Sequence, residues 1–208
     1  MTKPLLEDSN SGSTSLPVQK ILVAEPIYSA MRPEVYANRL EFWAYMSKHS
    51  GARLISLILG PRRSIRSARQ IAVQMAMEKA ASHLFFMDDD ILVQPDILQQ
   101  LLRVDKPIVG GLMHRDDGDP IVFQEASIGE VAWRDHPKSG AFECLAVGAG
   151  CMLIRREVLE TLSPRRRFLF NYDESERSMD VLFCRMARDA GFSVWCWPDD
   201  PCTQVRHY

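Results

Sequence analysis

The most informative part of the sequence is LFFMDDDILVQPDILQQLL, from Leu84 to Leu102. Its apolar opening predicts a buried strand, and three consecutive aspartates, Asp88, Asp89 and Asp90, follow directly at the carboxyl end of that strand. A helix is predicted after them, from about Pro95 to Arg103. Open α/β sheets bind ligands beyond the carboxyl ends of their strands, so the aspartates stand where a ligand site is expected.

The chemistry of these aspartates favours a divalent cation. Side chains alternate across a strand, so Asp88 and Asp90 can point the same way and share one ion while Asp89 points elsewhere. Mg²⁺ and Mn²⁺ bind one or two carboxylates together with substrate phosphates, so a nucleoside diphosphate is expected to supply the remaining ligands of the ion. Aspartates after a strand also cap helices or form Asx turns, but three in succession behind four apolar residues favour the ligand site. Phosphotransferases and nucleases use such aspartates too, so the motif alone indicates metal and phosphate.

Upstream of this stretch, strands and helices alternate. Residues 20–26 predict a buried strand that ends at a proline, because proline cannot donate to a sheet ladder. Residues 34–49 have helical spacing, with Leu40, Trp43 and Ala44 on one side, Tyr36 and Arg39 near that side, and Gly51 as a C-terminal cap. A second strand, ARLISLIL, and a second helix from Ile65 to Ala81 lead to the aspartate-bearing strand. This alternation predicts a parallel sheet with covering helices, an α/β fold.

The second half of the chain continues in the same style. Further strands are predicted over residues 107–113, 120–124, 142–148, 151–155 and 192–197, and further helices over 157–162 and 179–190. No internal repeats are present. At 208 residues a single domain is expected.

Composition and the first residues limit the function classes. A hydrophobic fraction of 46% and a charged fraction of 25% are ordinary for a globular protein, and a net charge of -2 gives no bulk electrostatic case for nucleic acid. The 5 cysteines contain no CxxC pair, so neither a disulfide framework nor a structural zinc site is indicated. Residues 1–19 are expected to be a flexible tail, followed by one domain over residues 20–208. Without a signal-peptide core or a membrane span, a cytoplasmic protein is expected.

Several further motifs, taken with the aspartates, resemble the GT-A fold glycosyltransferases, particularly the inverting family 2 type of bacteria and phages. The match runs from about Ile21 to His207, and it implies a single Rossmann-like domain with a mixed, mostly parallel sheet covered by helices on both faces. AEPIY resembles the loop that holds the nucleotide base, which implies donor contacts by Ala24, Pro26 and Tyr28. RSIRSARQIA resembles the arginine-bearing helix start of that family.

The same resemblance assigns roles to the charged residues. Arg66 and Arg69 are placed for the base or the diphosphate, although Gln70 stands where the family has Asn. The three aspartates match the family's DxD signature, which implies that Asp88 and Asp89 contact the donor.

In the same way Asp88, Asp90 and His207 are implied to hold the metal. GAGCMLIRREVLETL, residues 148–162, resembles the family's glycine-rich segment, and read alone it also fits a tight turn before a buried strand. The family's Glu-Asp pair appears as Met179-Asp180, so Asp180 inherits the role of general base; alternatively it is a helix N-terminal charge.

The function implied is metal-dependent transfer of a hexose or pentose from a nucleotide sugar to an acceptor hydroxyl, with inversion and with Mn²⁺ or Mg²⁺. Two rivals remain: a nucleotidyltransferase that makes a nucleotide sugar, and a non-catalytic nucleotide-sugar-binding module. The first typically carries an early glycine-rich loop with basic residues, which residues 21–31 lack. The acceptor is left open among a saccharide, a lipid, a protein and modified DNA. Residues 165–167, three arginines, fit either a polyanion contact or a solvated face.

Overall fold

The computed structural model of this chain describes residues 19–28, 30–60, 63–115, 118–126, 129–165, 168–171 and 178–205. The expected tail lies outside these ranges except for Gln19, and so does His207. No helix of the described part of the chain is long and apolar enough to cross a membrane.

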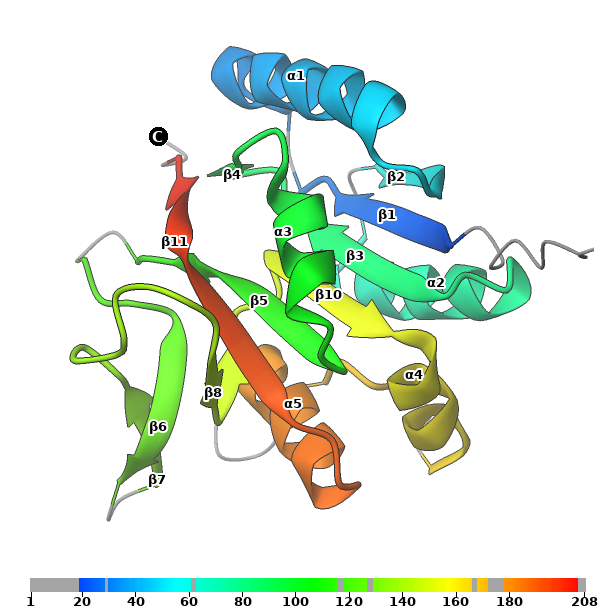
Figure 1. The fold of residues 1–208 in the computed structure, drawn as a ribbon. Helices are drawn as coiled ribbons and strands as arrows, with labels where there is room; N and C mark the ends of the chain where they lie inside the picture. The colour runs from blue at the N-terminus through cyan, green and yellow to red at the C-terminus, as the bar shows by residue number, and fades with distance from the viewer. Residues whose placement is uncertain are drawn as a thin grey trace, which may run out of the picture.

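The described residues form one main sheet, a small second sheet and five α-helices (Figure 1). The main sheet contains β1 (Lys20–Pro26), β2 (Arg53–Leu59), β3 (His83–Met87), β4 (Ile91–Leu92), β5 (Ile108–Met113), β8 (Phe142–Cys144), β10 (Cys151–Arg155) and β11 (Val194–Gln204). The second sheet contains β6 (Val122–Ala126), β7 (Gly129–Ala132) and β9 (Ala146–Val147). The helices are α1 (Pro33–His49), α2 (Ile65–Glu78), α3 (Ile97–Val104), α4 (Arg156–Leu162) and α5 (Met179–Asp189), and a 3-10 turn, η1 (Ser163–Arg165), follows α4.

The main sheet is mixed and mostly parallel, as expected from the sequence. Its order is β2-β1-β3-β10-β5-β11-β4, with β8 paired to β11. The strands β1, β2, β3, β5 and β11 run in one direction, and β10 runs against them between β3 and β5. The carboxyl ends of β1, β3 and β11 therefore lie at the same edge, which brings segments distant in sequence to the aspartates.

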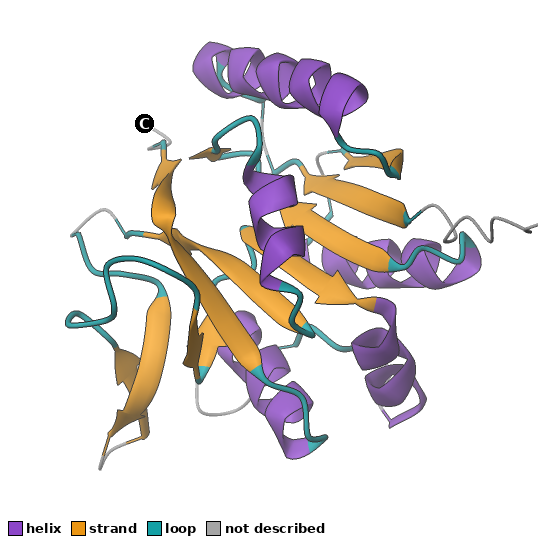
Figure 2. Ribbon diagram, viewed as in Figure 1, coloured by secondary structure: helices purple, strands orange, loops and turns teal. Residues whose placement is uncertain are grey.

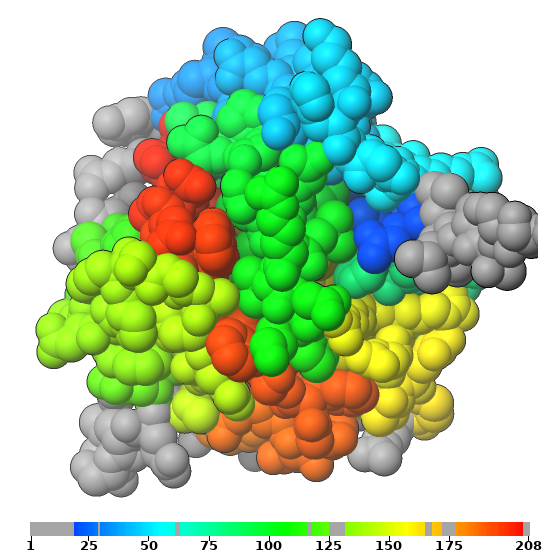
Figure 3. All heavy atoms as spheres, viewed as in Figure 1, coloured from blue at the N-terminus to red at the C-terminus, as the bar shows by residue number. Residues whose placement is uncertain are grey.

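Helices cover both faces of the sheet (Figure 2). One face packs against α1 and α3 through alternate strand residues such as Ile21, Val23 and Phe85. The other packs against α2, α4 and α5 through the intervening ones, such as Leu22 and Phe86. This alternation follows from the two-residue period of a strand buried on both faces. In the space-filling view, α3 lies in the middle of one face between α1 and β11 (Figure 3).

The buried side of α1 differs from the prediction. Leu40 was expected to face inward, but it is 55% exposed, and Tyr36 is 58% exposed. The helix instead buries a stripe at spacings of four, three and four residues: Val35, Arg39, Phe42 and Met46. Phe42 packs against Phe85 of β3, with ring centroids 6.2 Å apart. Arg39 was placed near the predicted side, but Phe42 and Met46 were not, so the buried stripe is rotated around the helix from the predicted one.

Candidate functional site

The aspartates lie where the central strand β3 stops. Its last four residues, Leu84 to Met87, are completely buried, and the chain changes from apolar to charged at the next position. The backbone N–H of Asp88 donates to the carbonyl of Gly150 at 2.9 Å, which ties this end of β3 to the turn before β10. The carboxylates are thus held at the edge predicted from the sequence.

Arg69 of α2 joins two of the predicted site residues. Its guanidinium is 4% exposed and donates to Asp88 Oδ2 at 3.0 Å and to Asp180 Oδ1. The other oxygen of Asp180 accepts the backbone N–H of Ala149 at 2.9 Å. The start of α5, where Ser178 caps the helix, is thereby brought to the end of β3. Asp180 sits beside the aspartates, with both oxygens already accepting hydrogen bonds.

Asp88 is an acidic group under electrostatic strain. Its Oδ1 is buried, and no described residue donates a hydrogen bond to it. Burial, with the nearby charges of Asp180, Asp90 and Asp89, outweighs Arg69 and raises the pKa of Asp88 to about 6. A buried, unpartnered carboxylate oxygen costs free energy unless a cation or donor reaches it.

Asp89 and Asp90 point to different partners. Asp89 is 5% exposed, and its Oδ2 accepts the backbone N–H of Tyr28 at 2.7 Å, so it holds the loop after β1. Asp90 Oδ2 accepts from Gln204 Nε2 at 2.7 Å, and the Asp90 carbonyl accepts from the Val205 N–H at 2.6 Å. The end of β11 is therefore fastened to the aspartates, two residues before His207.

The Asp88 carboxylate fits a divalent cation, and His207, the expected third ligand, lies outside the described residues. Asp88 offers an unpartnered carboxylate oxygen, and oxygen is the ligand that Mg²⁺ and Mn²⁺ prefer. Among the described residues, no group of three histidine, cysteine, aspartate or glutamate side chains is arranged to hold a metal. A two-carboxylate site completed by phosphate oxygens, and by His207 as expected, needs no such group.

A buried network below Asp88, which the sequence analysis missed, supports the site. Arg39 of α1 and Glu25 of β1 form an ion pair at 3.1 Å, each with only 4% of its side chain exposed. Arg39 Nη2 also donates to the Asp88 carbonyl at 2.6 Å, and Trp43 Nε1 donates to Glu25 at 3.3 Å. A signal was present in the sequence, since Glu25 interrupts an otherwise apolar strand next to a proline.

The glycine-rich turn before β10 is required by packing around Asp88. A Cβ atom at Gly150 would lie 3.1 Å from Asp88 Oδ2 and 3.0 Å from Met113 Sδ. A Cβ at Gly148 would lie 2.3 Å from Met113 Cε. The segment is thus a tight turn before a buried strand, and it is also a wall of the site.

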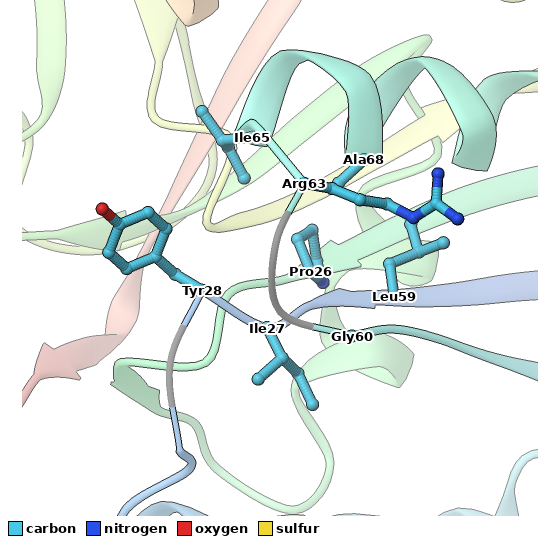
Figure 4. A pocket seen from close by; sticks show the side chains of 8 residues that line it. All are labelled: Pro26, Ile27, Tyr28, Leu59, Gly60, Arg63, Ile65 and Ala68. Carbon is cyan, nitrogen blue, oxygen red and sulfur yellow. The ribbon is translucent and has the colours of Figure 1, made fainter.

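A small hollow of about 10 Å³, room for about one water molecule, opens beside the loop after β1. Figure 4 shows Pro26, Tyr28 and Ile65 around it, with the guanidinium of Arg63 directed away from Tyr28. Tyr28 is 77% exposed. Ala24, the third expected contact, has its side chain completely buried in the sheet and does not line the hollow.

The other basic residues near α2 are arranged differently from Arg69. Arg66 is exposed, donates to Asn171 Oδ1 at 3.1 Å, and lies 5.1 Å from the Phe168 ring centroid. Gln70 accepts the N–H of Leu169 at 3.2 Å, so it ties α2 to that same segment. Residues 166–167 lie outside the described residues.

No protein-family model matches the sequence, and no curated protein matches it by sequence. Solved structures do match by fold. A197 from STIV matches with a TM-score of 0.56 and 16% identity, over 92% of this chain and 96% of A197. GalNAc-T7 with UDP, GalNAc and Mn²⁺ matches with a TM-score of 0.53 and 13% identity, over 91% of this chain and 44% of that one.

TarS of S. aureus matches with a TM-score of 0.52 and 13% identity, over 90% of this chain and 37% of TarS. The chain therefore spans less than half the length of GalNAc-T7 and TarS. At these identities the likeness establishes the fold, which is the GT-A type found in nucleotide-sugar glycosyltransferases.

Proposed function

We propose that this chain, with its GT-A fold, transfers a sugar from a nucleoside-diphosphate sugar to an acceptor hydroxyl with inversion. The observation that carries the proposal is the unpartnered Oδ1 of Asp88, buried at the carboxyl end of β3 and one guanidinium away from Asp180. Asp88, which needs a cation, is then a neighbour of Asp180, a carboxylate able to accept a proton. Sugar transfer to a hydroxyl requires a positive charge at the leaving diphosphate and a base for the hydroxyl proton.

The donor is proposed to lie across the loop after β1 and the aspartates. Tyr28 offers an exposed ring for stacking on the base, at the mouth of the hollow beside Pro26. Asp89 keeps that loop in place through the Tyr28 N–H. Arg66, exposed on the first turn of α2, is available to the diphosphate at the cost of its contact with Asn171.

Asp88 and Asp90, with His207 as the expected third ligand, would hold Mn²⁺ or Mg²⁺. The bound ion supplies positive charge where the diphosphate leaves. Asp180 accepts the proton of the acceptor hydroxyl, and Arg69 and the Ala149 N–H fix the direction of its free lone pairs. Arg69 therefore acts as a positioning residue between Asp88 and Asp180.

Release of nucleoside diphosphate tests the proposal. Purified protein is incubated with Mn²⁺ and UDP-, GDP-, CDP- and dTDP-sugars, and the released nucleotide is quantified. We expect release from at least one donor, its loss in Asp90→Ala, and a decrease of about 10²- to 10⁴-fold in Asp180→Asn with nucleotide binding retained. Asp189→Asn, an exposed aspartate at the end of the same helix, is the matched control.

Other outcomes would replace the proposal with one of its rivals. Tight binding of a nucleotide sugar without any release would indicate a binding module. Formation of a nucleotide sugar from a nucleoside triphosphate and a sugar phosphate would indicate a nucleotidyltransferase. Equal loss of binding and release in Asp180→Asn would assign that aspartate a structural role.

A further inference from the structure

A second hollow, of about 320 Å³, lies away from the aspartates. It is an open depression lined by residues of β6 and β8, the residue after β7 and the last turn of α5. Figure 1 shows these elements on the side of β11 opposite α1. The side chains that matter here are Phe123, Gln124, Trp133, Glu143 and Arg188. None of them belongs to the site described above. Arg188 lies about 12 Å further along α5 than Asp180, at roughly 1.5 Å per residue. The volume is within the range of small-molecule sites, about 300 to 1,000 Å³.

One wall of this hollow is a rigid aromatic ring. Trp133 is half-buried, and it packs edge-on against Phe142, with ring centroids 5.3 Å apart and an interplanar angle of 82°. Its backbone N–H donates to the Val122 carbonyl at 2.8 Å, which ties the residue to β6. No described residue accepts a hydrogen bond from its Nε1. The ring therefore presents an apolar surface together with a free donor, as ligand-binding tryptophans do.

The polar walls carry both signs of charge without an ion pair between them. Glu143 is exposed on β8, and Arg188 is half-buried on α5. Within the described residues, neither side chain makes a hydrogen bond or an ion pair, and the amide of Gln124 makes no hydrogen bond. Three residues with groups able to donate or accept thus line one hollow, and the described residues do not use the hydrogen-bonding capacity of those groups.

The mixture of charges selects the class of ligand. An anion would be repelled by Glu143, a cation by Arg188, and an apolar ligand would leave both charges without a partner. A neutral polyhydroxylated molecule satisfies both, because its hydroxyls donate to Glu143 and accept from Arg188 while a ring face packs on Trp133. We propose that this hollow binds a neutral saccharide. The inference goes beyond the proposed function, since binding here requires neither a donor nor a metal.

Saccharide binding is tested without nucleotide or metal, so that its failure is separate from a failure of sugar transfer. Neutral trisaccharides of glucose, galactose, mannose or N-acetylglucosamine are screened by saturation-transfer NMR, and those that bind are titrated calorimetrically. We expect at least one to bind, with Kd raised about ten-fold or more in Arg188→Gln and in Glu143→Gln, because each loses a charged hydrogen bond. Arg53→Gln and Glu41→Gln, exposed residues on β2 and α1, are matched controls that should leave Kd unchanged.

Trp133→Phe keeps an aromatic wall but removes the indole donor, so it should weaken binding by a smaller factor while the melting temperature confirms the fold. Three outcomes would overturn the proposal. These are no binding by any trisaccharide, unchanged affinity in both charge variants, and binding of the zwitterions glycine or glutamine in place of the saccharides.

Discussion

Variants of the buried Glu25–Arg39 ion pair should show whether the pair stabilises the fold, positions Asp88 for nucleotide binding, or does both. Glu25 and Arg39 are each 4% exposed, so Arg39→Met leaves a carboxylate buried without its partner. Breaking such a pair costs about 3 to 5 kcal/mol, whereas replacing both partners with apolar residues is often neutral. We therefore expect Arg39→Met to lower the free energy of unfolding by about 3 kcal/mol or more. The Glu25→Leu/Arg39→Met double variant should recover most of it. Burial already raises the pKa of Glu25, and loss of Arg39 raises it further, so part of the penalty should appear as proton uptake.

The double variant still lacks the hydrogen bond from Arg39 to the Asp88 carbonyl. A charged hydrogen bond contributes about 1.5 to 3 kcal/mol, so metal-dependent binding of nucleoside diphosphate should weaken by about ten-fold or more even though stability returns. Urea unfolding measures the first quantity and isothermal titration calorimetry the second. A double variant as unstable as Arg39→Met, or one that binds nucleotide like the wild type, would refute the reasoning.

Three further predictions concern single groups of the site. Because the folded-state pKa of Asp88 is about 6, above its ordinary 3.8, the metal-free protein should bind more protons folded than unfolded, and its free energy of unfolding should fall as pH rises from about 4 to about 6. The fall is at most about 3 kcal/mol, and Asp88→Asn should flatten it in urea titrations at each pH; an unchanged slope contradicts the assignment. Gly150→Ala should weaken metal-dependent nucleotide binding, because its Cβ would lie 3.1 Å from Asp88 Oδ2 and the carboxylate would have to shift by a few tenths of an ångström. Calorimetry measures this affinity, and wild-type affinity in Gly150→Ala would show that the contact does not constrain Asp88. Tyr28→Ala should weaken nucleoside diphosphate binding by about ten-fold or more, because the base loses its stacking partner. Tyr36 is a similarly exposed tyrosine on α1, and Tyr36→Ala should bind normally. Equal nucleotide affinities of the two variants would remove Tyr28 from the donor site.

The sequence predicted the order of elements and the place of the aspartates because both are local patterns. An apolar run that ends in three charges marks the end of a buried strand wherever it occurs, and β3 stops at Met87 as expected. The α/β alternation of the first half was confirmed, as were the helices and most strands of the second half. The strand predicted over residues 142–148 is instead two short strands in different sheets, β8 and β9, and the short strands β4 and β7 were not predicted. Their pairing was not readable from the chain, since β10 enters between β3 and β5 against their direction.

The contacts of the charged residues depend on partners distant in sequence, and local patterns do not carry them. The apolar side of α1 was placed at Leu40, Trp43 and Ala44 rather than at Phe42 and Met46, because the strands against which the helix packs decide which side is buried. Arg69 was expected at the base or the diphosphate, and this role stays a prediction; its contacts with two carboxylates from different elements could not be read from the sequence. The proposed metal and donor roles of Asp88, Asp90 and His207 stay predictions.

Binding of nucleoside diphosphates by isothermal titration calorimetry, with and without Mn²⁺, tests the central claim most directly. We expect at least one of UDP, GDP, CDP and dTDP to bind only when Mn²⁺ is present, and we expect Asp90→Ala to lose this binding while Asp189→Ala keeps it. Equal affinity with excess chelator, or unchanged affinity in Asp90→Ala, would contradict the claim that the aspartates after β3 hold a cation for the donor.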